Sequence, residues 1–92
     1  MLDETFELFQ QRKLNAGFDQ VLVRDWAPYF ANEPHTHDWD TEALVAHGEF
    51  WLTLNDGIHH YKAGDTFTVL RGVVHSEKYG AEGAVFWAAR KN

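Results

Sequence analysis

Two histidines separated by a single residue, His35 and His37, follow Pro34 in the segment "EPHTHDWD". On a β-strand, residues i and i+2 point to the same face of the sheet, so these two imidazoles would project together. Neutral imidazoles are common ligands of transition metals, and a pair at this spacing can chelate one ion. The alternative is two polar side chains on an ordinary strand. The pair alone predicts half of a metal site, which residues elsewhere in the chain must complete.

The composition limits the ligands and partners that are available. The chain has 92 residues and no cysteine, so thiolate metal sites and disulfides are excluded and any metal must be held by imidazole or carboxylate. Eight Lys and Arg against 14 Asp and Glu give a net charge of −6, which disfavours nucleic acid as a partner. An acidic N-terminal segment without a long apolar run predicts neither a signal peptide nor a membrane span. We therefore expect a soluble, cytoplasmic protein that binds neither nucleic acid nor membrane.

One helix is predicted, near the N-terminus, over residues 3–14. Asp3 or Thr5 can cap its first turn, and a glycine follows its end, as is typical of helix boundaries. Its apolar side chains fall on one face, which we expect to pack on the rest of the domain or on a second subunit. We therefore assign residues 1–17 as a helical extension.

From residue 18 onward, apolar segments alternate with turn signals. The "NDG" triplet at 55–57 predicts a β-hairpin. Within residues 42–54, we expect a pair of strands interrupted near Gly48. Turns at intervals of about 8–12 residues indicate a β-sandwich or a β-barrel. Residues 18–92 are therefore predicted to form a single all-β domain.

The segment "GDTFTVLRGVVH", which ends at His75, adds a third histidine in a distinctive frame. Together with the histidine pair it resembles the two motifs of small single-domain cupins, which read roughly G-x5-H-x-H-x3,4-E-x6-G and G-x5-P-x-G-x2-H-x3-N. The matching residues are His35, His37, Gly48, Gly64, Gly72 and His75. The resemblance covers residues 35–79 and implies a double-stranded β-helix of jelly-roll type, as in RmlC-like cupins. It also implies that the three histidines hold one divalent transition metal ion, Fe, Mn, Ni, Cu or Zn.

The carboxylate ligand of the first motif is displaced in this sequence. Counted back from the motif's final glycine, it falls on Thr41, whereas Glu42 fits the count forward from His37. A shift of one residue turns a strand side chain to the opposite face, so Glu42 is either a ligand brought inward by a bulge or an exposed residue. Glu77 lies two residues after His75 and would share its face. It is predicted as a fourth ligand or as a base that moves a proton, with a surface position as the alternative.

Aromatic side chains predict a pocket for a small, partly apolar molecule with a metal-chelating pair of oxygens. Trp39 lies two residues after the histidine pair, near any open coordination position. On later strands, one face of each strand must fill the barrel. The residues predicted to contact the substrate are Trp39, Phe50, Phe67 and Trp87. For each of them, the alternative is a place in the core or in a dimer interface.

Three classes of function are compatible with these observations. The first is a metal-dependent enzyme of dioxygenase, isomerase or decarboxylase type, acting on a small oxygenated molecule with Glu42 or Glu77 as a catalytic carboxylate. The second is a non-catalytic module that binds or senses a small molecule or metal. The third is an interaction protein with a vestigial barrel, because Leu70 and Tyr79 replace the proline and asparagine of the second motif. We favour the enzyme and expect a homodimer, the commonest closed assembly.

Overall fold

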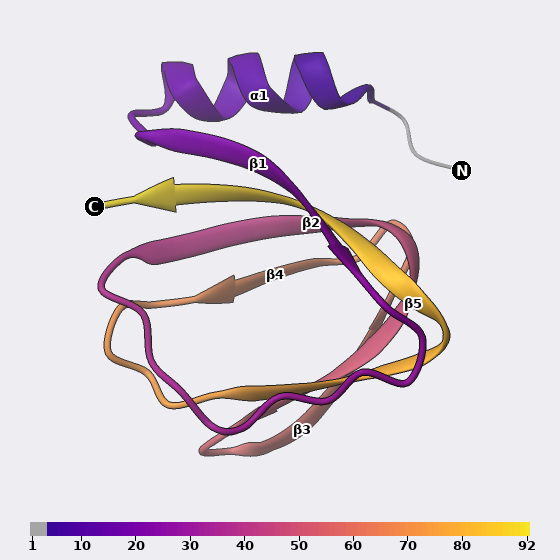
Figure 1. The fold of residues 1–92 in the computed structure, drawn as a ribbon. Coiled ribbons are helices and arrows are strands. Elements are labelled where there is room, and N and C mark those ends of the chain that lie inside the picture. Colours follow the sequence, from indigo (N-terminus) through magenta and orange to yellow (C-terminus); the bar gives the residue numbers. More distant parts are fainter. Residues whose placement is uncertain (1–3) are drawn as a thin grey trace.

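The strands of this protein form one antiparallel sheet that curls into a barrel, with a helix packed on its outside (Figure 1). A computed structural model describes residues 4–92. Its elements are α1 (Phe6–Asn15), β1 (Gln20–Trp26), β2 (Asp40–Leu54), β3 (Gly57–Lys62), β4 (Thr66–Val69) and β5 (Ser76–Lys91). The strand order is β1-β5-β2-β3, and β4 also pairs with β2. The predicted all-β barrel with a short N-terminal helix is confirmed.

Helix α1 packs on the barrel of its own chain. Its first turn is capped by Thr5, whose hydroxyl accepts a hydrogen bond of 3.3 Å from the backbone N–H of Leu8; Asp3, the other predicted cap, lies outside the described residues. Phe9 is only 1% exposed, and its ring lies 5.8 Å from that of Trp87 on β5. The apolar face of the helix is therefore used within the chain. In the described part of the chain, no helix is long and apolar enough to cross a membrane.

The two long strands, β2 and β5, bend where two glycines meet. Gly48 and Gly83 have φ angles of 78° and 66°, a backbone conformation that residues other than glycine rarely adopt. A Cβ atom on Gly48 would lie 2.1 Å from the carbonyl oxygen of Gly83, so the two backbones approach too closely for any side chain. The β2–β5 register shifts on both sides of Gly48. The expected interruption near this glycine is thus a bend within one continuous strand, and the prediction of two separate strands is wrong.

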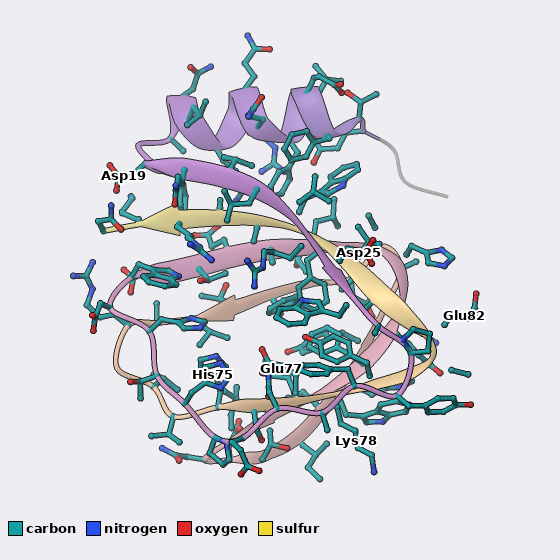
Figure 2. All side chains as sticks on the ribbon, viewed as in Figure 1. Asp19, Asp25, His75, Glu77, Lys78 and Glu82 are labelled. Carbon is teal, nitrogen blue, oxygen red and sulfur yellow. The ribbon has the colours of Figure 1, made fainter. Side chains whose placement is uncertain are left out.

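The barrel is filled at one end and hollow at the other. The predicted hairpin at "NDG" is confirmed: Leu54 pairs with Gly57 across a two-residue loop. Aromatic rings fill the end next to the bend at Gly48 and Gly83, where Phe50 and Phe86 lie 4.6 Å apart between ring centroids. The buried residues of this core are Ala43, Val45, Phe50, Leu52, Phe67, Val69, Tyr79, Ala84, Phe86 and Ala88. In Figure 2, the side chains of His75 and Glu77 lie inside the barrel and that of Lys78 points away from it.

Candidate metal centre

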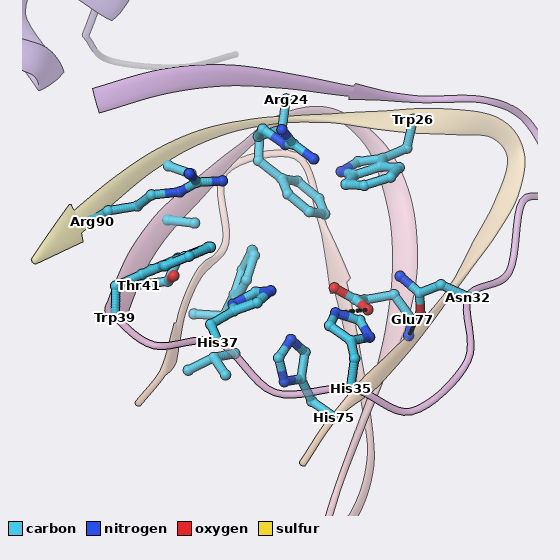
Figure 3. Close-up of a pocket in the computed structure, with 15 residues that line it drawn as sticks. Arg24, Trp26, Asn32, His35, His37, Trp39, Thr41, His75, Glu77 and Arg90 are labelled. Carbon is cyan, nitrogen blue, oxygen red and sulfur yellow. Dashed lines mark hydrogen bonds and ion pairs between the residues drawn. The ribbon is translucent and has the colours of Figure 1, made fainter. Parts of the chain in front are cut away.

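Three histidines meet inside the barrel. A backbone bridge joins His35 to His75, with a hydrogen bond of 2.9 Å in each direction, and His37 follows two residues later on the same segment. One ring nitrogen from each of the three residues lies within 4.8 Å of the other two. Figure 3 shows the three imidazoles side by side at one end of the pocket. The structure therefore brings together the three residues predicted as metal ligands.

Hydrogen bonds to the backbone orient two of these imidazoles. Nδ1 of His35 lies 2.8 Å from the carbonyl oxygen of Glu33, and Nδ1 of His75 lies 2.9 Å from that of Val73. A neutral imidazole that donates its Nδ1–H to a carbonyl keeps the lone pair of Nε2 free, which is the arrangement typical of metal-ligating histidines. His37 has a buried Nδ1 without a hydrogen-bond partner. This orphaned atom and the two oriented rings fit a transition-metal ion.

Electrostatics keep His37 neutral. Burial, the neighbouring His75 and His35, and the more distant positive charges of Arg90 and Arg24 together lower its pKa from 6.5 to about 4. The lone pair of this imidazole is therefore available at neutral pH, as metal binding requires. In residues 4–92, the group of side chains placed to hold a metal consists of the three histidines. With three ligands, an ion would keep open positions for water or substrate, as catalytic sites do.

Glu77 lies beside the three histidines, on the face that the sequence predicts. Its side chain is 11% exposed, and its Oε2 atom is 3.9 Å from Nε2 of His35. The same oxygen is buried without a hydrogen-bond partner. The backbone N–H of Glu77 donates a hydrogen bond of 2.7 Å to Oδ1 of Asn32, which ties the first residues of β5 to the loop before His35. The catalytic role of this carboxylate stays a prediction.

Glu42 lies on the other face of β2, and its assignment as a metal ligand and catalytic residue is wrong. Its neighbours Thr41 and Ala43 line the pocket. Glu42 instead points to the helix, where its Oε1 atom lies 2.6 Å from Nζ of Lys13. A bulge between the histidine pair and Ala43 would have turned this carboxylate inward, but the irregularities of β2 occur later, around Gly48.

The cavity next to the histidines has a volume of about 160 Å³. Of the four aromatic residues predicted to contact a substrate, Trp39 and Phe67 line this cavity. Phe50 is fully buried in the packed end of the barrel. Trp87 faces outward, with its ring 5.9 Å from that of Phe6 on the helix. The assignments of Phe50 and Trp87 as substrate contacts are therefore corrected to core and helix contacts.

Two arginines in the pocket were missed by sequence reasoning. The guanidinium carbon of Arg24 lies 4.9 Å from the ring centroid of Trp26, and that of Arg90 lies 4.3 Å from the ring of Trp39. Trp39 also stacks on His37, with 4.7 Å between ring centroids. Strand alternation was the available signal, since Arg24 and Trp26 are two residues apart on β1 and so share a face. Pairing of β1 with β5 turns that face toward the histidines.

The curled antiparallel barrel is the fold of a cupin, and solved structures of cupins share it. The chain is similar to the Cnp3 cupin domain of Schizosaccharomyces pombe (TM-score 0.71, 18% identity, 78% of this chain and 51% of that chain). It is also similar to an RmlC-like cupin from Shewanella frigidimarina (TM-score 0.67, 21% identity, 78% of this chain and 65% of that chain). A third similar structure is a variant of Bacillus subtilis oxalate decarboxylase (TM-score 0.72, 22% identity, 90% of this chain and 24% of that chain). These identities show the fold alone, and the chain spans about half of the yeast domain and about a quarter of the decarboxylase.

The family follows from the sequence match. Residues 15–89 match the family described as the AraC-like ligand binding domain, and the chain belongs to this family. None of the curated proteins matches the chain. The predicted cupin fold is thereby confirmed, and the family shown is that of the AraC-like ligand binding domain.

Proposed function

We propose that this protein is a metal-dependent cupin enzyme acting on a small oxygenated molecule, with one divalent transition metal ion held by His35, His37 and His75. The observation that carries the proposal is the convergence of three imidazoles, one nitrogen each, at one end of a cavity inside the barrel. Two of these rings are oriented by backbone carbonyls and the third is neutral at physiological pH. Such a tripod leaves room for a ligand next to the ion.

The bound ion would supply Lewis acidity to an oxygen atom of the substrate. The residues of the chain have the remaining roles. Glu77 has a buried carboxylate oxygen without a partner, 3.9 Å from the nearest imidazole nitrogen, and is placed to accept a proton from a substrate carbon or oxygen and return it. Phe67, Val69 and Phe86 form an apolar wall of the cavity, against which the apolar part of a substrate can pack. These roles favour isomerase or decarboxylase chemistry, in which a proton is moved.

The test is the metal content of tag-free protein purified without oxygen, compared with the variants His75→Ala and His47→Ala. His47 is a matched control because it is exposed and pairs with Glu82 at 3.6 Å, outside the cavity. We expect about one ion per chain in the wild type and in His47→Ala. Loss of the His75 ligand should weaken metal binding by more than about 100-fold. Removing a residue that only hydrogen-bonds to a metal ligand weakens binding by at most about that factor, and loss of a ligand itself should cost more. A wild type that takes up none of Fe, Mn, Ni, Cu or Zn after reconstitution would refute the proposal.

Membership of the AraC-like ligand-binding family favours a second candidate, a non-catalytic module that binds a small molecule. The two functions differ in turnover. Metal-loaded protein incubated with small hydroxy and oxo acids should consume one of them if it is an enzyme, and consumption followed by NMR should fall in the Glu77→Gln variant. Binding that leaves every compound unchanged would support the module instead.

A further inference from the structure

The cavity has a second polar end, formed by two arginines on adjacent strands. Arg24 is on β1 and Arg90 is on β5, and the antiparallel pairing of these strands directs both side chains into the pocket. Figure 3 shows both guanidinium groups on the side of the pocket opposite His35 and His75. The substrate cavity therefore lies between a histidine end and an arginine end.

Within the described part of the chain, neither arginine has an anionic partner. Among residues 4–92, no carboxylate lies within salt-bridge distance of Arg24 or Arg90, and neither guanidinium makes a hydrogen bond to the protein. Partial burial is the main cause that lowers the pKa of Arg90, and the positive charge of Arg24 lowers it further. Removing positive charge from water without compensation is unfavourable, so such a pair is expected to attract an anion into the cavity.

Aromatic rings leave the guanidinium edges free to bind. Trp26 lies against Arg24 and Trp39 against Arg90, at 4.9 and 4.3 Å from guanidinium carbon to ring centroid. A ring contacts a guanidinium group from one side only, so the N–H groups that point away from the ring remain available. The indole Nε1 atoms of both tryptophans are also buried without a hydrogen-bond partner. This end of the cavity is thus rich in donors and poor in acceptors.

We propose that this arginine end, formed by Arg24, Trp26, Trp39 and Arg90, binds the carboxylate group of a small carboxylic acid. A planar carboxylate matches the edge of a guanidinium group and accepts two parallel hydrogen bonds from it. The cavity of about 160 Å³ is smaller than the roughly 300–1,000 Å³ of pockets that take drug-sized ligands, which suits a small acid. The other end of the acid, bearing an oxygen, faces the histidines, and this second contact alone rests on the proposed metal function.

Calorimetric titration with malonate tests the proposal, because one carboxylate of malonate can meet the arginines while the other faces the histidines. Malonamide, its uncharged analogue, is the ligand control. The variants are Arg24→Gln and Arg90→Gln, and the matched control is Arg12→Gln, whose side chain is exposed on α1 and pairs with Glu4 at 2.7 Å. Each pocket variant should bind malonate about 10- to 100-fold more weakly, as expected for loss of a charge-assisted hydrogen bond. Arg12→Gln should bind like the wild type, and malonamide should not bind.

Metal content and melting temperature are measured for every variant. If a glutamine variant does not fold, Arg24→Lys or Arg90→Lys replaces it, and the loss of in-plane pairing should still weaken malonate binding. The proposal is overturned if the wild type does not bind malonate, if the pocket variants bind it as tightly as Arg12→Gln, or if inorganic phosphate binds more tightly than malonate. Malonate binding that needs both arginines in a protein that takes up no metal would refute the metal centre and support the carboxylate site.

Discussion

The main chains of His35 and His75 hydrogen-bond to each other in both directions, at 2.9 Å, and their rings lie 4.3 Å apart between centroids. This bridge joins the loop between β1 and β2 to the residue that precedes β5. Two of the three imidazoles are therefore placed by backbone pairing, and no side-chain rearrangement is needed to bring them together. A site held in this way is preorganised for its ligand.

The neutral state of His37 predicts how the stability of the metal-free protein depends on pH. Its pKa is about 4 in the folded chain and 6.5 when unperturbed, so the unfolded chain binds more protons between these values. The free energy of unfolding should therefore fall as the pH falls from 6.5 to 4. In His37→Gln, urea midpoints measured across this range should fall less steeply. An unchanged slope in this variant, with His47→Gln as the exposed control, would contradict the prediction.

Mutation of Glu42 and mutation of Glu77 should have different effects on metal binding. Glu42→Gln weakens only the pair with Lys13 on the outside of the barrel, so metal content and ligand binding should not change. Glu77→Gln removes a carboxylate 3.9 Å from the His35 ring, and its effect on metal affinity should be roughly 10-fold or more, the range for groups that support a ligand. Metal titrations of both variants measure the difference, and equal affinities would show that Glu77 does not support metal binding.

Close backbone approach at Gly48 predicts a large loss of stability on adding a methyl group. A Cβ there would lie 2.1 Å from the carbonyl oxygen of Gly83, whereas a Cβ on Gly64 would meet nothing within 4 Å. Both residues have positive φ, so Gly64→Ala should cost about 1–2 kcal/mol from backbone strain alone. Gly48→Ala should cost clearly more, because the bend of β2 and β5 must open. Urea denaturation of both variants measures the difference, and similar losses would rule out the steric explanation.

Phe9 is predicted to hold the helix on the barrel. Its side chain is 1% exposed, packed among Trp87 and neighbouring apolar residues, so Phe9→Ala should lower the free energy of unfolding by about 3–5 kcal/mol. The matched control is Leu8→Ala, since Leu8 is 54% exposed and its loss should cost less than about 0.5 kcal/mol. Thermal and urea unfolding of the two variants provide the comparison. A small effect of Phe9→Ala would mean that α1 contributes little to the fold.

Local patterns predicted the residues whose positions depend on short-range geometry. Alternation along a strand places His35 with His37, and it carries Glu77 to the same side of the barrel as His75. The cap at Thr5 and the hairpin at "NDG" likewise depend on a few neighbouring residues. These features follow from backbone chemistry that the sequence displays directly.

Local patterns could not predict the residues whose positions depend on strand pairing and on the location of bulges. Glu42 depends on where β2 bulges, and a single extra residue decides which face it occupies. Trp87 follows the inward-facing Phe86 and so must face outward, but the sequence does not say which of the two adjacent aromatics is inside. Arg24 and Arg90 are 66 positions apart, and only the pairing of β1 with β5 brings them to one cavity.

The pairing of β1 with β5 also determines at which stage of synthesis the pocket can form. Gln20 on β1 pairs with Arg90 on β5, so the first strand has no partner until the last one is present. During synthesis, a nascent chain still lacking residues 76–91 can have neither the closed barrel nor Glu77 and Arg90 in place. Closure of so long a loop makes folding slow relative to helical proteins of this size. Binding of any ligand in this pocket therefore has to follow synthesis of β5 and its pairing with β1.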